Sequence, residues 1–173
     1  MGVSGKKCTN FIAQNVNFLN YPIGQYHCKL DAKGRLMLPA DCKVQLGELA
    51  EEGFVLRPGL FDQCLELYTM SDWTKTQEKL RALNQFVRSN VELVRKYNAG
   101  AKMVKLDGTG RIQIPKNLVE AGKLQKEVIL TSLTSNMELW DKAAYEARIN
   151  SLDQDAFEKL ATEKLGSVDQ TSL

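Results

Sequence analysis

The sequence is poor in the residues that catalytic and metal centres use. Its 173 residues include one histidine, His27, and four cysteines, Cys8, Cys28, Cys42 and Cys64, none of which forms a Cys-x-x-Cys pair. That spacing gives neither a zinc knuckle nor a disulfide framework, so we expect reduced, structural thiols. His27 and Cys28 are neighbours on a predicted strand and point to opposite faces, which argues against a catalytic dyad. With no nucleotide phosphate loop either, we predict no enzyme activity, no cofactor, no metal and no small-molecule substrate.

Long apolar runs are also missing. A membrane-spanning helix needs about 18 consecutive apolar residues, and no segment approaches that length. Lys6 and Lys7 lie near the N-terminus, but asparagine and glutamine interrupt the residues that follow, so the apolar region of a signal peptide is absent. We therefore expect no membrane association and a cytoplasmic location.

A strong charge of one sign is absent as well. With 23 Lys and Arg against 21 Asp and Glu, the net charge of +2 does not by itself suggest nucleic acid. The charge is unevenly distributed, however: it is +2 over residues 27–43, +4 over residues 101–126, and −4 over residues 138–173. These blocks are either solvated surface charge or a functional basic face, and charge alone leaves both interpretations open.

The most informative feature of the sequence is an internal repeat. Residues 29–39 read KLDAKGRLMLP and residues 105–115 read KLDGTGRIQIP, with identical residues at six of eleven positions. A Glu-Leu-aromatic triplet follows each copy, at residues 66–68 and 138–140. The second copy is four residues shorter between these landmarks, as loops tolerate. The chain is therefore a duplication.

Each copy predicts a strand, a tight turn and a return strand. Apolar and polar residues alternate before each turn, with the period of a half-buried strand. Asp31 and Gly34 hold the first and fourth positions of the turn, where Asp accepts backbone N–H bonds and Gly tolerates positive φ. Asp107 and Gly110 repeat this chemistry. A proline ends each return strand, since it donates no ladder hydrogen bond. The pattern predicts two β-hairpins.

Further elements are expected after each hairpin. They are a short helix (to about residue 49, and 116–121), a second strand pair (54–56 with 65–68, and 128–130 with 137–140) and one long amphipathic helix (71–99 capped by Ser71, and 141–165). Two strand pairs of this length cannot bury both faces within one copy, whereas two copies packed face to face can. We therefore predict a β-rich α+β fold, with a pseudo-twofold barrel built from both repeats and amphipathic helices beside it.

The two turns also resemble a known superfamily. Asp-x-x-Gly-Arg followed by Leu-x-Leu-Pro or Ile-x-Ile-Pro resembles the AbrB-like, swapped-hairpin superfamily. Residues 23–26 (Ile-Gly-Gln-Tyr), 121–124 (Ala-Gly-Lys-Leu) and 138–140 (Glu-Leu-Trp) make the chain similar to the MraZ family of bacterial transcriptional regulators, from about Tyr21 to the C-terminus. The resemblance implies a tandem repeat of AbrB-like swapped hairpins, a double-split β-barrel, with flanking amphipathic helices.

The resemblance also implies a domain organisation. The expected segments are an N-terminal extension (1–20), a first AbrB-like repeat (25–72), a connecting helix (73–100), a second AbrB-like repeat (101–144) and a C-terminal helix and tail (145–173). The family usually begins near the Ile-Gly-x-Tyr element, so residues 1–20 are a departure from its pattern. We expect this extension to be disordered, and it has no assigned role.

The same resemblance implies a function. Members of the family form ring-shaped homo-oligomers, associate with the nucleoid and bind short direct repeats in the double-stranded promoter DNA of their own operon. They chiefly repress that operon, which belongs to the division and cell-wall gene cluster. One hairpin would neutralise few phosphates and bind weakly at physiological salt, so we expect several hairpins of one oligomer to engage successive repeats.

The candidate DNA-binding residues lie at and beside the hairpin tips. Arg35 either folds back onto Asp31 and closes the turn or, with Lys33, meets phosphates or guanine edges; both can hold together. In the second copy Thr109 stands at the position of Lys33, so the first repeat is predicted to do most of the recognition. Lys29 and Lys105 are phosphate contacts or solvated charges. The predicted DNA-binding residues are Lys29, Lys33, Arg35, Lys105, Thr109 and Arg111, and the turn residues are Asp31, Gly34, Asp107 and Gly110.

Two other function classes remain open at this point. One is an antitoxin-like protein-binding module whose acidic tail occupies a basic partner. The other is a structural oligomer with an incidental basic face. The duplication and the two long amphipathic helices favour the DNA-binding regulator, because antitoxins of the AbrB-like superfamily usually carry one hairpin copy and a disordered tail.

Overall fold

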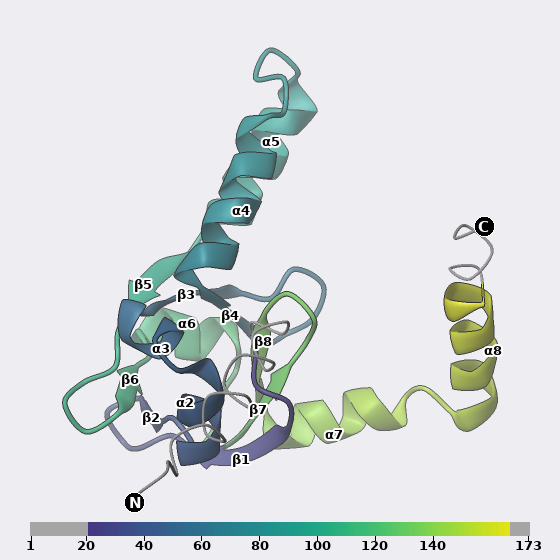
Figure 1. Ribbon diagram of the computed structural model, residues 1–173. Helices are drawn as coiled ribbons and strands as arrows, with labels where there is room; N and C mark the ends of the chain where they lie inside the picture. Colours follow the sequence, from purple (N-terminus) through teal and green to yellow (C-terminus); the bar gives the residue numbers. More distant parts are fainter. Residues whose placement is uncertain (1–20, 167–173) are drawn as a thin grey trace, which may run out of the picture. The chain divides into compact units, whose positions relative to one another are not determined.

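The computed structural model describes residues 21–166 and divides the chain into two compact units, one ending at Asp141 and one beginning at Lys142 (Figure 1). The expectation for residues 1–20 lies outside the described residues, as do Cys8 and residues 167–173. Within the described part of the chain, no helix is both long and apolar enough to cross a bilayer.

The first unit contains both copies of the repeat. The first copy comprises β1 (Gln25–Lys29), β2 (Arg35–Met37), α2 (Ala40–Leu46), α3 (Leu49–Glu52), β3 (Phe54–Pro58) and β4 (Leu65–Thr69). The second comprises β5 (Lys102–Val104), β6 (Arg111–Gln113), α6 (Lys116–Ala121), β7 (Glu127–Ser132) and β8 (Met137–Asp141). The predicted second strand pair of each copy and the short helix after Pro115 are confirmed.

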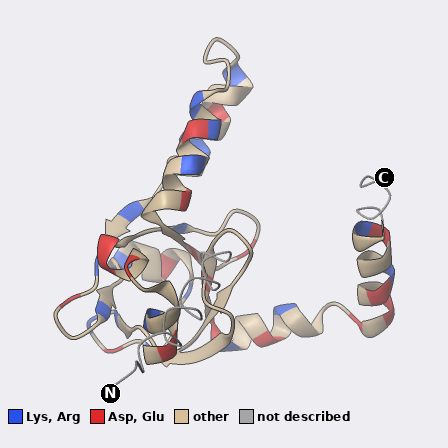
Figure 2. Ribbon diagram, in the orientation of Figure 1, with Lys and Arg blue, Asp and Glu red and all other residues tan. Residues whose placement is uncertain are grey.

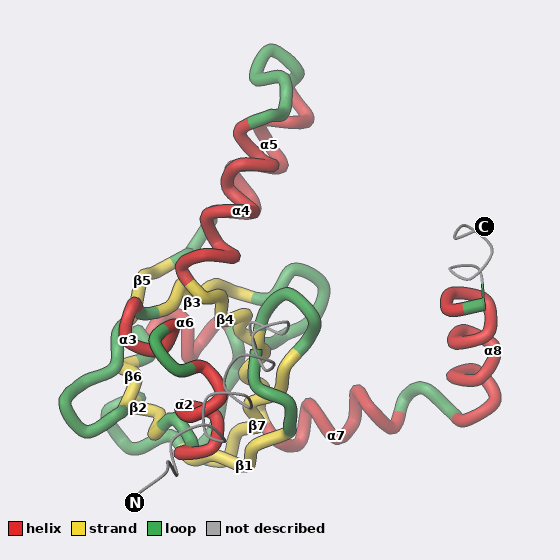
Figure 3. The backbone as a smooth tube through the Cα atoms, in the orientation of Figure 1, coloured by secondary structure: helices red, strands yellow, loops and turns green. Residues whose placement is uncertain are grey.

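The strands of the two copies are interleaved. Six of them form an antiparallel sheet in the order β1-β7-β8-β4-β3-β5, while β2 and β6 pair as a separate two-stranded ribbon (Figure 3). The first strand of each copy therefore pairs with a strand of the other copy: β1 pairs with β7, and β5 pairs with β3. The protein is a mixed α+β fold with a mostly antiparallel sheet, and neither copy forms a sheet of its own.

The predicted barrel does not close among the described residues. The three-residue strands β2 and β6 join β1 and β5 only through the isolated bridges Leu30↔Leu36 and Leu106↔Ile112. Apart from these bridges, the return strand of each copy pairs with the return strand of the other copy, with Leu36 opposite Ile112. The expectation of two self-contained hairpins is therefore wrong beyond the turns. The swapped-hairpin topology of the AbrB-like superfamily stays a prediction.

Equivalent positions of the two copies face each other. Leu36 lies opposite Ile112 in the ribbon, and Glu66 lies opposite Glu138 where β4 pairs with β8. These pairs relate the two copies by a pseudo-twofold axis. The core is correspondingly shared, and its fully buried members include Leu36, Leu38, Phe54, Leu56, Leu65, Ile112, Ile114, Leu118, Leu130 and Met137.

Two helices, not one, connect the copies. The sequence predicted a single helix over residues 71–99, but α4 (Met70–Arg81) and α5 (Arg88–Asn98) are separated by a turn and lie side by side (Figure 1). The turn contains Asn84, whose side chain accepts a hydrogen bond from the Phe86 N–H (2.9 Å) and so competes with helical pairing. The reversal lets Trp73 stack on Tyr97, with ring centroids 5.9 Å apart.

The first of these helices begins one residue earlier than expected, and its cap lies two residues earlier. Thr69 caps α4 by accepting a hydrogen bond from the Asp72 N–H at 3.3 Å, in place of the predicted cap Ser71. Gln77 of α4 donates to the Asn98 side chain of α5 at 2.8 Å, which adds a polar contact between the two helices.

The second unit also contains two helices where one was predicted. Helix α7 (Lys142–Asn150) ends before Ser151, and α8 (Gln154–Leu165) begins after Asp153, whose side chain accepts a hydrogen bond from the Ala156 N–H at 2.8 Å. An N-cap of this type starts a new helix. The helical spacing of the apolar residues therefore continues across a position where one helix ends and another begins.

Candidate nucleic-acid interface

The first turn is organised around one carboxylate. Asp31 Oδ1 accepts hydrogen bonds from the backbone N–H groups of Lys33 (2.8 Å) and Arg35 (2.9 Å), and Oδ2 accepts one from Arg35 Nε (2.6 Å). The backbone N–H of Arg35 contributes most to holding the pKa of Asp31 below its ordinary value. Gly34 adopts φ of 74°, the left-handed region that glycine enters without strain.

The second turn repeats this arrangement with one difference. Asp107 Oδ1 accepts hydrogen bonds from the Thr109 hydroxyl (2.6 Å) and from the backbone N–H groups of Thr109 (2.8 Å) and Arg111 (3.0 Å). The Thr109 hydroxyl is the largest cause that lowers the pKa of Asp107. The Thr109 side chain is therefore hydrogen-bonded within the turn, whereas the Lys33 side chain is exposed at the equivalent position.

The two turn arginines share the outer face of the ribbon. Leu36 and Ile112 point into the core, so Arg35 and Arg111, one position away on each strand, point outward. The register sets Arg35 opposite Gln113 and Arg111 opposite Met37. The arginines are thus diagonal neighbours, a relation that corresponds to about 7–8 Å between residues of adjacent strands.

Each arginine is held at one nitrogen and exposed at the others. Arg35 Nε pairs with Asp31 at 2.6 Å and Arg111 Nε pairs with Asp107 at 3.3 Å, while both side chains keep 30% of their surface exposed. Among residues 21–166, no group accepts a hydrogen bond from the terminal nitrogens of either arginine. The fold-back of Arg35 onto Asp31 is therefore observed, and it leaves two N–H₂ groups available for an external acceptor.

The second copy also holds the first turn in place. Gln113 Nε2 donates to the backbone carbonyl oxygens of Lys33 (2.8 Å) and Ile114 (3.2 Å). At the equivalent position of the first copy stands Met37, which cannot donate a hydrogen bond and is 48% exposed. The two turns therefore differ in support as well as in charge.

Sequence reasoning missed one residue, Lys43. It lies on α2 of the first copy, yet its Nζ reaches the second turn, where a methyl group added to Gly110 would lie 2.6 Å from it. The equivalent residue of the second copy, Val119, lies against Gly34 of the first turn. The first turn thus carries Lys33 of its own copy, and the second turn receives Lys43 from the other copy. In the sequence, Lys43 and Val119 each stand four positions after the repeat proline. That each lies at the turn of the other copy follows only from the interleaving of the two copies.

The remaining predicted residues lie beside the ribbon. Lys29 ends β1 and faces Glu127 across the sheet, and Lys105 follows β5 with its side chain against Gly53. Both are exposed, and the structure brings neither onto the ribbon's outer face. Figure 2 shows Lys and Arg beside the ribbon and along α4 and α5.

Among residues 21–166, the structure gives His27 and the cysteines no common site. His27 is exposed and Cys28 is buried, on opposite faces of β1. Burial raises the pKa of the Cys28 thiol to about 11 and that of Cys42 to about 12, which keeps both thiols protonated near neutral pH. Across residues 21–166, no three His, Cys, Asp or Glu side chains gather in a way that could hold a metal ion.

Comparison with known proteins places the two copies in one family. The model of a family described as "MraZ protein, putative antitoxin-like" matches residues 23–95 and again residues 98–167, so that each match covers one copy of the repeat. Both matches together span most of the chain.

Individual relatives agree with this match. The chain is 42% identical over 150 residues to a protein named Transcriptional regulator MraZ from Flavobacterium psychrophilum, covering 87% of this chain and 95% of the relative. It is 42% identical to the protein of the same name from Christiangramia forsetii (85% and 94%) and 37% identical to that from Thermoanaerobacter sp. (80% and 93%). A solution structure of PHS018 from Pyrococcus horikoshii is 12% identical over 68% of this chain and 86% of that one, with a TM-score of 0.29, too low to carry an argument.

Proposed function

We propose that this chain, which belongs to the MraZ family, is a transcriptional regulator that binds double-stranded promoter DNA through the outer face of its β2–β6 ribbon. The observation that carries the proposal is the presentation of Arg35 and Arg111, each fixed at Nε with its terminal nitrogens exposed. The major groove admits a two-stranded ribbon, and guanine offers the O6 and N7 acceptors that an arginine contacts in pairs.

The turns supply rigid support for this readout. A charged side chain that is already oriented loses less entropy on binding, so Asp31 and Asp107 act as positioning residues for the arginines. Lys33 at the first turn and Lys43 at the second add the charge that phosphates attract. Thr109 supports its turn, and Lys29 and Lys105 are contacts to phosphates farther along the duplex.

The proposal includes assembly, because one ribbon is a weak ligand for DNA. Large apolar side chains are exposed in both units, among them Phe86 (99%) in the first and Phe157 (54%) and Leu165 (70%) in the second. Exposed apolar residues of this size are typical of protein interaction surfaces. We assign them to a ring-shaped homo-oligomer, which would present several ribbons to successive direct repeats.

The family supplies the biological setting of the proposal. The chain would bind upstream of its own division and cell-wall operon, chiefly as a repressor, and would be found with the nucleoid. The relatives' printed name is that of a regulator of transcription, which is a non-enzymatic role.

A mobility-shift measurement with the DNA upstream of this gene tests the proposal. Arg35→Ala removes one arginine contact per ribbon, and a bidentate arginine–guanine pair contributes about 1–3 kcal/mol of discrimination. The retarded complex should therefore be lost at protein concentrations that shift the DNA with the unaltered chain. Arg88→Ala is the matched control, since Arg88 is exposed on α5 and paired with Glu92.

The oligomer must be intact in both variants for this comparison, as size-exclusion chromatography would show. Unchanged retardation of the promoter DNA by Arg35→Ala would contradict the proposed role of the ribbon.

A second candidate function comes from the family description, which includes the term antitoxin-like. In that case a basic partner protein would occupy the chain's acidic C-terminal segment. Purification of the chain from its own cells with a stoichiometric toxin, together with no retardation of promoter DNA at low salt, would favour this candidate over the regulator.

A further inference from the structure

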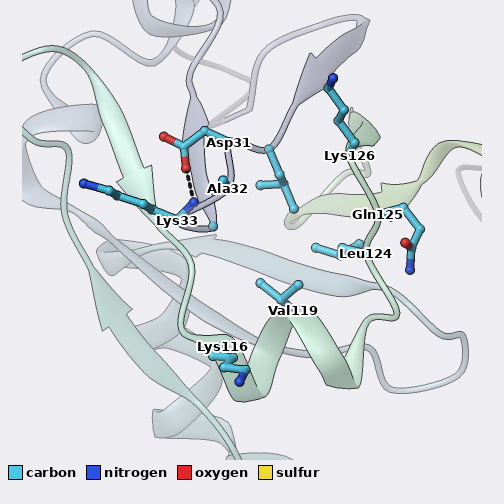
Figure 4. Close-up of a pocket in the computed structure, with 10 residues that line it drawn as sticks. Asp31, Ala32, Lys33, Lys116, Val119, Leu124, Gln125 and Lys126 are labelled. Atoms are coloured by element: carbon cyan, nitrogen blue, oxygen red, sulfur yellow. Dashed lines mark hydrogen bonds between the residues drawn. The ribbon is translucent and has the colours of Figure 1, made fainter.

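A pocket of about 660 Å³ lies beside the first turn (Figure 4). Both copies line it: the turn comes from the first, and α6 with the segment before β7 comes from the second. Its floor is apolar and includes Leu30, Val119 and Leu124. Three lysines stand around this floor, namely Lys33, Lys116 and Lys126.

The positive charge of these lysines is not neutralised locally. All three side chains are exposed, and no carboxylate within residues 21–166 forms a salt bridge with any of them. Asp31 also borders the pocket, but its two oxygens already accept hydrogen bonds from the turn backbone and from Arg35. An anion that approaches the first turn therefore meets a net positive rim.

This cluster belongs to one turn only. In the pseudo-equivalent places around the second turn, Thr109 replaces Lys33 and Ala40 replaces Lys116. The segment that corresponds to the one with Lys126 is the acidic end of α3, with Glu51 and Glu52. The second copy thus contributes two lysines beside the first turn, whereas Lys43 is the one lysine of the first copy that we place beside the second turn.

The geometry of the lysines favours an extended polyanion over a small ligand. Figure 4 shows Lys33 and Lys126 extending in different directions, both away from Val119 and Leu124 on the pocket floor. A small anion is held by polar groups that converge on it. Diverging ammonium groups at a rim fit successive phosphates of a nucleic-acid strand instead.

We propose that Lys116 and Lys126 contact backbone phosphates of the DNA bound by the first turn, together with Lys33. This inference rests on the proposed function and extends it, since it assigns to the second copy part of the interface centred on the first copy's turn. Phosphate contacts position a protein on the duplex and carry no sequence information directly. Their loss should weaken binding to every duplex equally.

The salt dependence of DNA binding tests the inference with a double variant, Lys116→Gln with Lys126→Gln. Each lost phosphate contact reduces the magnitude of the slope of log K against log salt by about 0.9, so that magnitude should fall by about 2 for each ribbon that contacts the duplex. For each ribbon that contacts the duplex, affinity for the promoter duplex and for a scrambled duplex should fall by the same factor, roughly ten- to thirty-fold near 0.15 M salt. Lys79→Gln with Lys96→Gln on α4 and α5 makes the same change in net charge and should leave the slope unaltered.

The outcomes separate this inference from the proposed function. If the double variant keeps the full slope while Arg35→Ala abolishes binding, the inference is wrong and the proposed function stands. Loss of binding to the promoter duplex alone would also overturn the inference, because it would indicate base readout. If the unaltered chain binds neither duplex, the proposed function fails and the inference fails with it.

A last arm addresses a small anionic ligand. Stabilisation of the unaltered chain by citrate that disappears in the double variant, with an unchanged salt slope, would assign the lysines to such a ligand and overturn the inference. The melting temperature of the double variant should equal that of the unaltered chain, since all substituted side chains are exposed.

Discussion

Asp31 and Asp107 each accept hydrogen bonds both from backbone N–H groups of the turn and from an arginine side chain. One oxygen accepts the N–H groups that close the turn, and the other accepts the arginine Nε that follows it. A hydrogen bond to an ionised group is stronger than a neutral one, so the carboxylate both shapes the turn and restrains the guanidinium. The sequence leaves a fold-back of Arg35 onto Asp31 open beside DNA contact, and the structure shows the pairing in both copies.

The hydrogen bonds that Asp107 accepts, first of all from the Thr109 hydroxyl, make stability depend on pH. Because the folded pKa of Asp107 lies below its ordinary value, its contribution is fully present above the unfolded pKa of about 3.9 and is lost as pH falls toward the folded pKa. Asp107→Asn should therefore lower the melting temperature near neutral pH. The difference from the unaltered chain should shrink as pH falls below about 4. A difference that stays constant with pH would contradict this account of the turn.

A residue from the second copy should matter to the first turn. Gln113→Ala removes the amide that donates to the Lys33 carbonyl at 2.8 Å, at a cost of about 1 kcal/mol. Amide hydrogen exchange should become faster in residues 31–35 and stay unchanged in residues 107–111. Met37→Ala is the matched control, since Met37 holds the equivalent exposed position and donates no hydrogen bond. Equal effects of the two substitutions on the first turn would contradict the supporting role of Gln113.

At the scale of elements, a buried ion pair links the helix α5 to the sheet. Arg57 of β3 donates from Nη1 to Glu66 Oε2 of β4 at 2.6 Å, and its guanidinium lies 4.2 Å from the centre of the Tyr97 ring on α5. The Tyr68 hydroxyl donates to Glu66 at 2.8 Å and lies 3.1 Å from the Tyr97 hydroxyl. Burial raises the pKa of Tyr68, so the phenol stays protonated and can donate.

Removal of one partner from this pair should be costly. Glu66→Ala leaves the buried Arg57 without its counter-charge, and we expect a loss of about 3–5 kcal/mol in the free energy of unfolding by urea. Glu92→Ala breaks the exposed Arg88–Glu92 pair on α5 and should change that free energy by less than about 1 kcal/mol. Similar losses in the two variants would show that the buried network does not stabilise the fold.

The sequence predicted strands more reliably than it predicted helix length. Strand alternation, the turn glycines and the repeat prolines are local signals, and they marked β3, β4, β7, β8 and α6. The predicted helix over 71–99 failed because apolar residues keep helical spacing through the turn that separates α4 from α5. The reversal depends on Asn84 and on packing between Trp73 and Tyr97, which spacing alone does not show.

For the whole molecule, interleaving makes each turn a product of both copies. The first turn rests on Gln113 and Val119 of the second copy, and the second turn receives Lys43 from the first. The sequence predicted Arg35 and Arg111 because the repeat displays them directly. It could not predict Gln113 or Lys43 as neighbours of the turns, since β2 pairs with β6 and not with a strand of its own copy.

Multiple ribbons should make binding depend on the number of DNA repeats. A duplex with two or more repeats should bind far more tightly than one with a single repeat, because the second contact is made at high effective concentration. Changing the spacing by half a helical turn should remove much of that gain, since the second ribbon would face the wrong side of the duplex. Equal affinity for single-repeat and multi-repeat duplexes, measured by fluorescence anisotropy, would rule out the multivalent mechanism.

The most direct test of the ribbon as the DNA interface is cleavage of bound promoter DNA by an iron–EDTA group attached at position 33. The variant Lys33→Cys with Cys8→Ser allows selective labelling, because Cys28, Cys42 and Cys64 are buried and their pKa values are raised. The account predicts strand cleavage within each promoter repeat from position 33, and none from the same group at Gln85→Cys between α4 and α5. Cleavage from position 85 with none from position 33 would contradict it.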